Sequence, residues 1–132
     1  MMKNIGHIGI MVEDLDQAIE SYTKGLGMTL EKTTENPALK QRAALLWLGS
    51  MEIELLEFKD PNLPVPKAIH AGKPGMNHFC IEVTRLDDTI NELKAKGFRL
   101  VEGFPRQGIH GRIAFVSPPH APEERIELLE VE

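Results

Sequence analysis

The sequence predicts an α+β fold in which two tandem βαβββ modules form a curved mixed sheet. Three observations lead to this prediction: the chain length, a set of repeated motifs, and strand-like alternation of apolar residues. The 132 residues suit a single domain, because domains commonly hold about 100–200 residues. A hydrophobic content of 42% is enough to fill one core at this size.

Three short motifs occur twice in the chain, in the same order and at nearly the same spacing. The pairs are His7–Val12 with His78–Val83, Leu15–Ile19 with Leu86–Ile90, and Ile53–Glu57 with Ile126–Glu130. The last pair is identical letter for letter, and chance explains such ordered identity poorly. We therefore predict one domain over residues 1–132, built from repeats 1–58 and 75–132 and joined by a Pro-rich linker, 59–74.

Each element of the first module has its own local signal. Alternating apolar residues predict a strand over residues 4–12. Asp14, with Gln17 three residues later, is placed to cap a helix, and Gly25 and Gly27 end it. The helix presents an apolar stripe of Leu15, Ile19, Tyr22 and Leu26. Three strands are then expected near residues 28–34, 42–48 and 51–58.

The second module repeats this order after a segment rich in proline. Prolines at positions 61, 64, 66 and 74 predict the linker. A strand is expected near residues 76–83, followed by a helix near 86–96 that stops at Gly97. The remaining strands are expected near residues 98–102, 111–116 and 125–130.

Residue parity assigns each side chain of a strand to one of two faces. In the first strand of each module, an apolar set faces the helix, and His7 or His78 faces the other way. In the last strand, Glu54 and Glu127 lie opposite the apolar residues. If the two sheets join into a curved surface, these four residues form the floor of a cup.

Two imidazoles and two carboxylates make a suitable site for a divalent metal ion, since nitrogen and oxygen donors are combined with negative ligand charge. Taken singly, a histidine on a strand is more often a structural residue, and a glutamate there usually faces solvent. The repeat favours the metal site, because all four residues occupy equivalent positions. Co, Ni, Zn and Mn all suit such ligands.

On these residues the chain resembles the vicinal oxygen chelate superfamily, also known as the glyoxalase/bleomycin resistance/dioxygenase fold. The resemblance covers nearly the whole chain and implies metal ligands at His7, Glu54, His78 and Glu127. Within the superfamily, the chain is most similar to methylmalonyl-CoA epimerases, chiefly through residues 105–115 and their Gly-x-His-Gly segment. That likeness implies an isomerase acting on an acyl-CoA.

The resemblance also implies roles in the reaction. A divalent ion would stabilise the enediolate formed when the α-proton is removed. Glu127 is expected to be the general base, with Glu54 as the equivalent group of the other module. His110, Gly111 and Arg112 are expected to contact the substrate. Residues 40–45 hold no carboxylate, so this region offers no second base.

Three alternatives stay open. Residues 22–40 are similar to bacterial glyoxalase I, which implies a lactoylglutathione lyase. Met11, however, stands where glyoxalase I carries an arginine for the glutathione carboxylate. A ring-cleaving dioxygenase prefers two histidines and one carboxylate around iron, and Glu54 adds a fourth ligand. A non-catalytic small-molecule-binding protein of the same superfamily is the last alternative.

Composition narrows the partners and the location. Fifteen Lys and Arg residues against 20 Asp and Glu give a net charge of −5, which argues against nucleic-acid binding. No apolar run reaches the roughly 18 residues of a membrane span. A single cysteine fits a reducing compartment, so we expect a cytoplasmic protein. The resemblance implies a homodimer.

Overall fold

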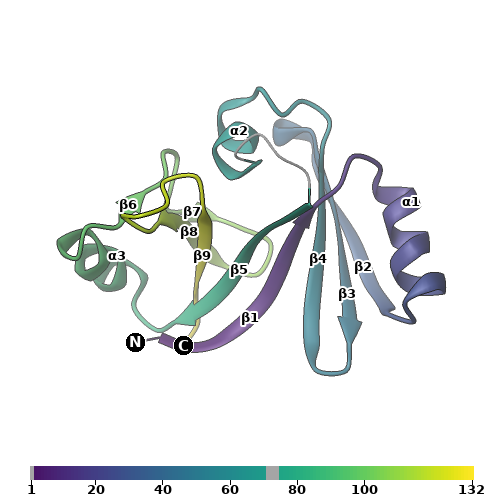
Figure 1. The fold of residues 1–132 in the computed structure, drawn as a ribbon, viewed down its shortest axis with the longest axis horizontal. Helices are drawn as coiled ribbons and strands as arrows, with labels where there is room; N and C mark the ends of the chain where they lie inside the picture. The colour runs from purple at the N-terminus through teal and green to yellow at the C-terminus, as the bar shows by residue number, and fades with distance from the viewer. Residues whose placement is uncertain (1, 71–74) are drawn as a thin grey trace. The chain divides into compact units, whose positions relative to one another are not determined.

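The computed structural model describes residues 2–70 and 75–132 and has a mixed α+β fold (Figure 1). The first module contains β1 (Met2–Met11), α1 (Leu15–Glu20), η1 (Ser21–Gly25), β2 (Thr29–Asn36), η2 (Pro37–Leu39), β3 (Gln41–Leu48) and β4 (Met51–Phe58). The second contains β5 (Gly75–Val83), α3 (Leu86–Ala95), β6 (Arg99–Leu100), β7 (Arg106–Gln107), β8 (Arg112–Ser117) and β9 (Arg125–Glu130). Helix α2 (Pro64–His70) lies between them. The predicted α+β class is confirmed, and the first module has the predicted order of a strand, a helix and three strands. The second module has the same order with one additional short strand, β7, between β6 and β8.

The chain divides into two compact units, which share β1. The N-terminal unit lies within His7–Asn77, and the C-terminal unit combines residues 2–6 with His78–Glu132. Strands in the N-terminal unit follow the order β2-β3-β4-β1, and those in the C-terminal unit follow β1-β5-β9-β8-β6, with β7 beside β8. β1 runs parallel to β4, and β5 runs parallel to β9. The first and last strands of each module are therefore neighbours.

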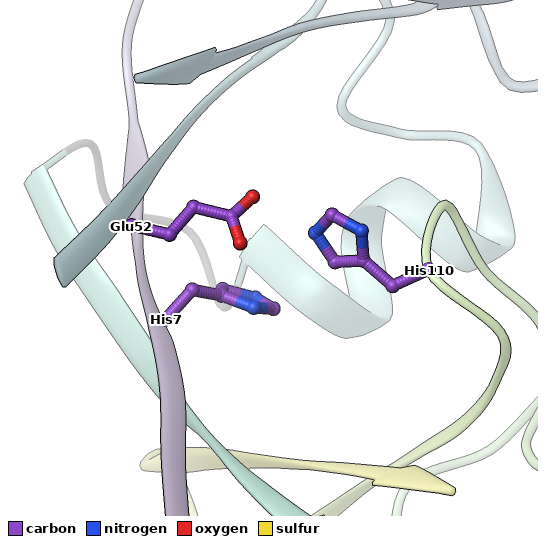
Figure 2. Close-up of side chains that lie close together, drawn as sticks. All are labelled: His7, Glu52 and His110. Carbon is purple, nitrogen blue, oxygen red and sulfur yellow. The ribbon is translucent and has the colours of Figure 1, made fainter. Parts of the chain in front are cut away.

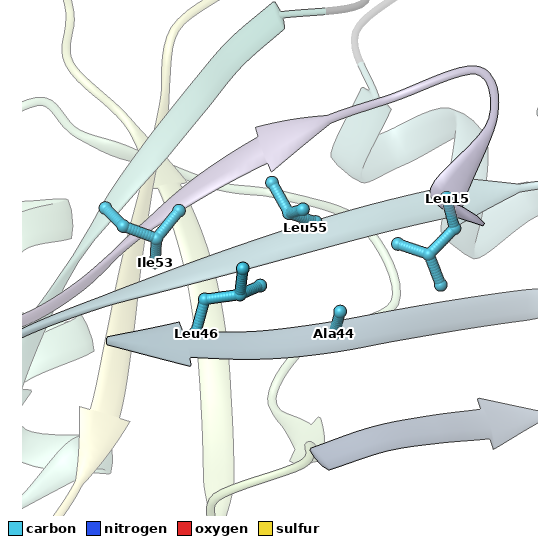
Figure 3. Packing of buried hydrophobic residues seen from close by; sticks show 5 residues of the cluster. All are labelled: Leu15, Ala44, Leu46, Ile53 and Leu55. Atoms are coloured by element: carbon cyan, nitrogen blue, oxygen red, sulfur yellow. The ribbon is translucent and has the colours of Figure 1, made fainter. Parts of the chain in front are cut away.

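The apolar core of the N-terminal unit lies between its sheet and α1. Buried side chains from α1, β3 and β4 form this core: Leu15, Ala44, Leu46, Ile53 and Leu55 (Figure 3). The same cluster is contacted by Ile8 and Ile10 of β1 and by Val12, which follows β1 directly. The faces predicted from parity are thus confirmed for β1 and β4. Each large aliphatic side chain buried here contributes about 1.5–3 kcal/mol.

The last residue of the repeated pentapeptide, Glu57 or Glu130, has a structural role at the start of a helix. A carboxylate oxygen of Glu57 accepts a hydrogen bond of 2.8 Å from the backbone N–H of Leu15, at the start of α1. Glu130 accepts an equivalent bond of 3.0 Å from Leu86, at the start of α3. The first N–H groups of a helix have no partner within the helix. The last strand of each module therefore caps the helix that packs on it.

An arginine lies beside each capping glutamate. This pair of equivalent arginines is less visible in the sequence than the repeated motifs. Nη2 of Arg42 lies 2.9 Å from Oδ1 of Asp16, and Nη1 of Arg42 lies 3.6 Å from Oε1 of Glu57. Nη2 of Arg112 lies 2.8 Å from Oδ1 of Asp87, and Nη1 of Arg112 lies 3.8 Å from Oε1 of Glu130. In both modules a guanidinium on the strand that precedes the last strand, β3 or β8, thus joins the helix to the last strand.

One local prediction was wrong, and two short elements were not predicted. Leu26 was expected in the apolar stripe of the first helix, but it is 60% exposed. The helix widens after Glu20 into a π turn, in which Leu26 N–H bonds to Ser21 C=O at 3.1 Å. The extra residue in the turn rotates Leu26 away from the core. Strand β7 and the short helix η2 were not predicted.

The predicted linker 59–74 contains helix α2. Pro64 and Pro66 lie in its first turn, where a proline costs little because the missing N–H would have no helical partner. Lys67 N–H bonds to Leu63 C=O at 2.8 Å and closes this turn. Residues 71–74 of the linker lie outside the described residues.

The caps predict a measurable loss of stability. We expect Glu57→Ala to lower the free energy of unfolding by about 1–3 kcal/mol, because the buried N–H of Leu15 loses its acceptor. Glu130→Ala should act similarly through Leu86. Urea denaturation measures both, with the exposed Glu13→Ala as control, for which a change below about 0.5 kcal/mol is expected. A Glu57→Ala effect no larger than the control would contradict the capping role.

Candidate active site

The N-terminal unit brings His7 and Glu54 together on the face opposite its apolar core. Parallel pairing of β1 with β4 sets Gly9 opposite Glu54 and His7 opposite Glu52. His7 Nε2 lies 3.7 Å from Glu54 Oε2. His7 is 1% exposed and Glu54 is 6% exposed. Two polar groups that are distant in the sequence therefore meet in a buried position.

The C-terminal unit repeats this arrangement with His78 and Glu127. His78 Nε2 lies 3.0 Å from Glu127 Oε1, and both residues are buried. Cys80 stands opposite Glu127 in the parallel pairing of β5 with β9. The ring of Phe115 meets the His78 ring edge-on, with centroids 4.9 Å apart. This packing restricts the orientation of the imidazole.

The donor set of these pairs suits a divalent cation. Each pair offers an imidazole nitrogen and a carboxylate oxygen, which Zn, Co, Ni and Mn all accept. Burying a charged carboxylate is costly unless an opposite charge or hydrogen bonds compensate it. Such a cation would provide that compensation in either unit.

Glu52 is a buried carboxylate that the sequence analysis missed. It is 7% exposed and lies two residues before Glu54 on β4, so parity places both on one face. One of its oxygens lies within 4.8 Å of a ring nitrogen of His7. Figure 2 shows both side chains extending from neighbouring strands toward the same side. Strand parity predicts this position for Glu52, but the second repeat carries Arg125 at the equivalent position, so the repeated motifs give no signal for it.

The segment expected to contact the substrate forms a tight turn before β8. Gly108 N–H donates to Gly111 C=O at 2.7 Å. Gly111 has φ +152°, and a Cβ on Gly108 would lie 2.8 Å from Cδ1 of Ile113. The backbone conformation at Gly111 and the close packing at Gly108 therefore both favour glycine in the Gly-x-His-Gly segment. His110, also labelled in Figure 2, is exposed.

Arg112 has a structural partner. Its guanidinium donates two hydrogen bonds to Asp87, of 3.1 and 2.8 Å. These bonds match those of Arg42 in the first module, so they account for an arginine at this position without a substrate. The roles of His110, Gly111 and Arg112 in substrate binding stay predictions.

The sequence profile of the Glyoxalase/Bleomycin resistance protein/Dioxygenase superfamily matches residues 6–115. The chain belongs to this superfamily. The resemblance expected from the histidine and glutamate positions is thereby confirmed. In the described part of the chain, no helix has the length and apolar character needed to cross a membrane.

Individual members of the superfamily are similar over nearly the whole chain. The solved structure of methylmalonyl-CoA epimerase from Mycobacterium tuberculosis is 34% identical, with a TM-score of 0.81 over 99% of this chain and 89% of that chain. Lactoylglutathione lyase from Escherichia coli O157:H7 is 30% identical over 94% of this chain and 90% of its own length. The uncharacterized Bacillus subtilis protein YqjC is 30% identical over 98% of this chain and 93% of its own length. The relatives with a named activity are thus enzymes of two reaction types.

Adding a Cβ should lower the stability of the fold more at Gly111, in the turn before β8, than at Gly25. We expect Gly111→Ala to destabilise the protein by about 1–3 kcal/mol, because φ +152° is a strained conformation for any other residue. Gly25→Ala is the control, since its Cβ would meet nothing within 4 Å. Thermal unfolding compares the two variants. Equal melting temperatures would contradict the strain argument.

The ion pair of Arg112 predicts a pH dependence. Hydrogen bonding to Arg112 holds the pKa of Asp87 below its ordinary value. A lowered carboxyl pKa stabilises the fold above the unfolded-state pKa, and this stabilisation is lost as the pH falls through the folded-state pKa. Asp87→Asn should therefore lower the melting temperature at neutral pH, and the difference should fade below about pH 4. A difference that is constant down to about pH 2 would refute this assignment.

Proposed function

We propose that this protein is a divalent-metal-dependent isomerase that abstracts the α-proton of an acyl-CoA, in the manner of a methylmalonyl-CoA epimerase. The observation that carries this proposal is the buried histidine–glutamate pair that occurs at equivalent positions in both units. Similarity to the Mycobacterium tuberculosis epimerase over nearly the whole chain supports an acyl-CoA as substrate.

In this proposal the four predicted ligands bind one divalent ion. His7, Glu54, His78 and Glu127 would hold Co, Ni, Zn or Mn. When bound, the ion would stabilise negative charge that develops on the carbonyl oxygen of the substrate. Burial of all four side chains supports such a role, because water is kept from the groups that act.

Glu127 is the proposed general base. Its carboxylate lies next to His78, whose ring is held by Phe115, so the base has a defined position. Epimerisation also requires a proton to return to the opposite face of the carbon. Glu54 occupies the equivalent position in the other unit, and Glu52 provides a further buried carboxylate beside it. These two residues are the candidates for the second proton transfer, since residues 40–45, which include the start of β3, contain no carboxylate.

A lactoylglutathione lyase is the second candidate function. The Escherichia coli relative and the likeness of residues 22–40 to glyoxalase I favour it. Met11 argues against it: this residue is 2% exposed and carries no charge for a glutathione carboxylate. A non-catalytic small-molecule-binding protein is the third candidate. A homodimer and a cytoplasmic location stay predictions under all three.

Proton exchange at the substrate α-carbon tests the leading proposal. Chelator-treated protein is incubated with methylmalonyl-CoA in D2O, and NMR follows the α-proton signal before and after Co(II) is restored. We expect exchange only with the metal, and at least an approximately 100-fold loss of rate in Glu127→Gln, as is typical for removal of a general base. The exposed Glu13→Gln serves as the matched control and should exchange like the wild type.

The same samples separate the candidate functions. Binding of Co(II) is followed by its visible absorption, which does not depend on turnover. No exchange in a protein that binds one Co(II) per chain would reject the acyl-CoA proposal. Turnover of methylglyoxal with glutathione would then establish the lyase. A chain that binds no divalent ion would contradict both enzymatic proposals.

A further inference from the structure

The thiol of Cys80 lies beside the His78–Glu127 pair of the C-terminal unit. Cys80 stands opposite Glu127 in the parallel pairing of β5 with β9, and it follows His78 by two residues on β5. Strand parity therefore places Cys80 and His78 on the same face, about 7 Å apart along the strand. The sulfur atom lies within 4.8 Å of a carboxylate oxygen of Glu127. A nitrogen, an oxygen and a sulfur donor thus come together within one unit.

All three side chains are buried. Cys80 is 0% exposed, His78 is 3% exposed and Glu127 is 6% exposed. Nε2 of His78 lies 3.0 Å from Oε1 of Glu127. A buried carboxylate is costly unless an opposite charge or hydrogen bonds compensate it. A cation that compensates Glu127 would lie next to the thiol on the neighbouring strand.

The first repeat has no donor at the equivalent position. Gly9 stands opposite Glu54 and two residues after His7, as Cys80 stands opposite Glu127 and two residues after His78. The two units therefore match at the histidine and the glutamate and differ at the residue between them. A thiolate is a soft ligand, so this difference changes the chemistry that the C-terminal unit offers to a metal ion.

We propose that Cys80 is a further ligand of the divalent ion and makes the protein bind Co and Zn in preference to Mn. Thiolate sulfur favours ions such as Zn, whereas Mn prefers oxygen ligands. When the sulfur–metal bond forms, the thiol releases its proton to the solvent. This inference rests on the metal dependence in the proposed function, and it adds a ligand and a metal preference to that function.

A role in packing alone is the alternative, because a buried cysteine often serves as a small apolar side chain. Val83 provides the comparison for this role. It is also 0% exposed on β5, but its distance of three residues from Cys80 places it on the opposite face of the strand. Replacement of Val83 therefore removes buried volume from the same strand without removing a donor next to Glu127.

Binding of Co(II) tests the thiolate ligand directly. The chain contains one cysteine, so a near-ultraviolet charge-transfer band between sulfur and Co(II) can come only from Cys80. We expect the chelator-treated full chain to develop this band in proportion to bound Co(II), and Cys80→Ser to lack it. The dissociation constant for Co(II) should rise about tenfold or more in Cys80→Ser, whereas that for Mn(II) should change by less than about threefold.

Val83→Ala is the matched control and should keep both the band and the affinity for Co(II). Circular dichroism of the metal-free variants establishes that each is folded, and Cys80→Ala provides a second replacement of the thiol. Absence of the band in the wild-type chain would overturn the proposal without reference to any variant. An unchanged affinity for Co(II) in both Cys80 variants would also overturn it, as would an equal loss of affinity in Val83→Ala.

The charge-transfer band and the exchange of the substrate α-proton are independent measurements. A band without exchange would retain Cys80 as a ligand and reject the acyl-CoA proposal. Exchange without the band would support the isomerase and reject Cys80 as a ligand. Failure of this inference is therefore distinguishable from failure of the proposed function.

Discussion

Parallel pairing of the first and last strand in each module is the constraint on which the candidate site depends. Parallel neighbours need a long connection, and here a helix and the strands that follow it provide the connection. This connection lets a histidine early in the module face a glutamate more than 40 residues later, as in His7 with Glu54 at 3.7 Å and His78 with Glu127 at 3.0 Å. The site therefore follows from strand order and needs no special loop.

The last strand of each module serves both of its faces. On β4, Glu54 lies on the same face as His7, while Ile53 and Leu55 enter the core and Glu57 caps α1. The arrangement on β9 is the same, with Glu130 capping α3. The apolar positions and the final glutamate of the pentapeptide thus have structural roles, and the proposed ligand role would account for its first glutamate.

The sequence predicted the fold and the two histidine–glutamate pairs, because a repeat combined with strand parity determines which side chains share a face. It missed features that the repeat does not contain. Glu52 has no acidic counterpart in the second module, and the π turn that exposes Leu26 has no recognisable local signal. The prolines of residues 59–74 predicted a linker, although prolines in a first turn are also compatible with helix α2. The arginine that completes each cap became apparent only when distances were known.

The register of β4 on β1 also affects which misfolded states are possible. A slip of β4 by one residue along β1 would exchange its two faces. Glu54 would then enter the apolar core beside Leu15, and Ile53 and Leu55 would leave it. The alternative register thus loses burial and gains a buried charge in the same step. The register that stabilises the core is therefore also the register that keeps His7 and Glu54 on one face, so the candidate site needs no separate mechanism to keep these residues aligned.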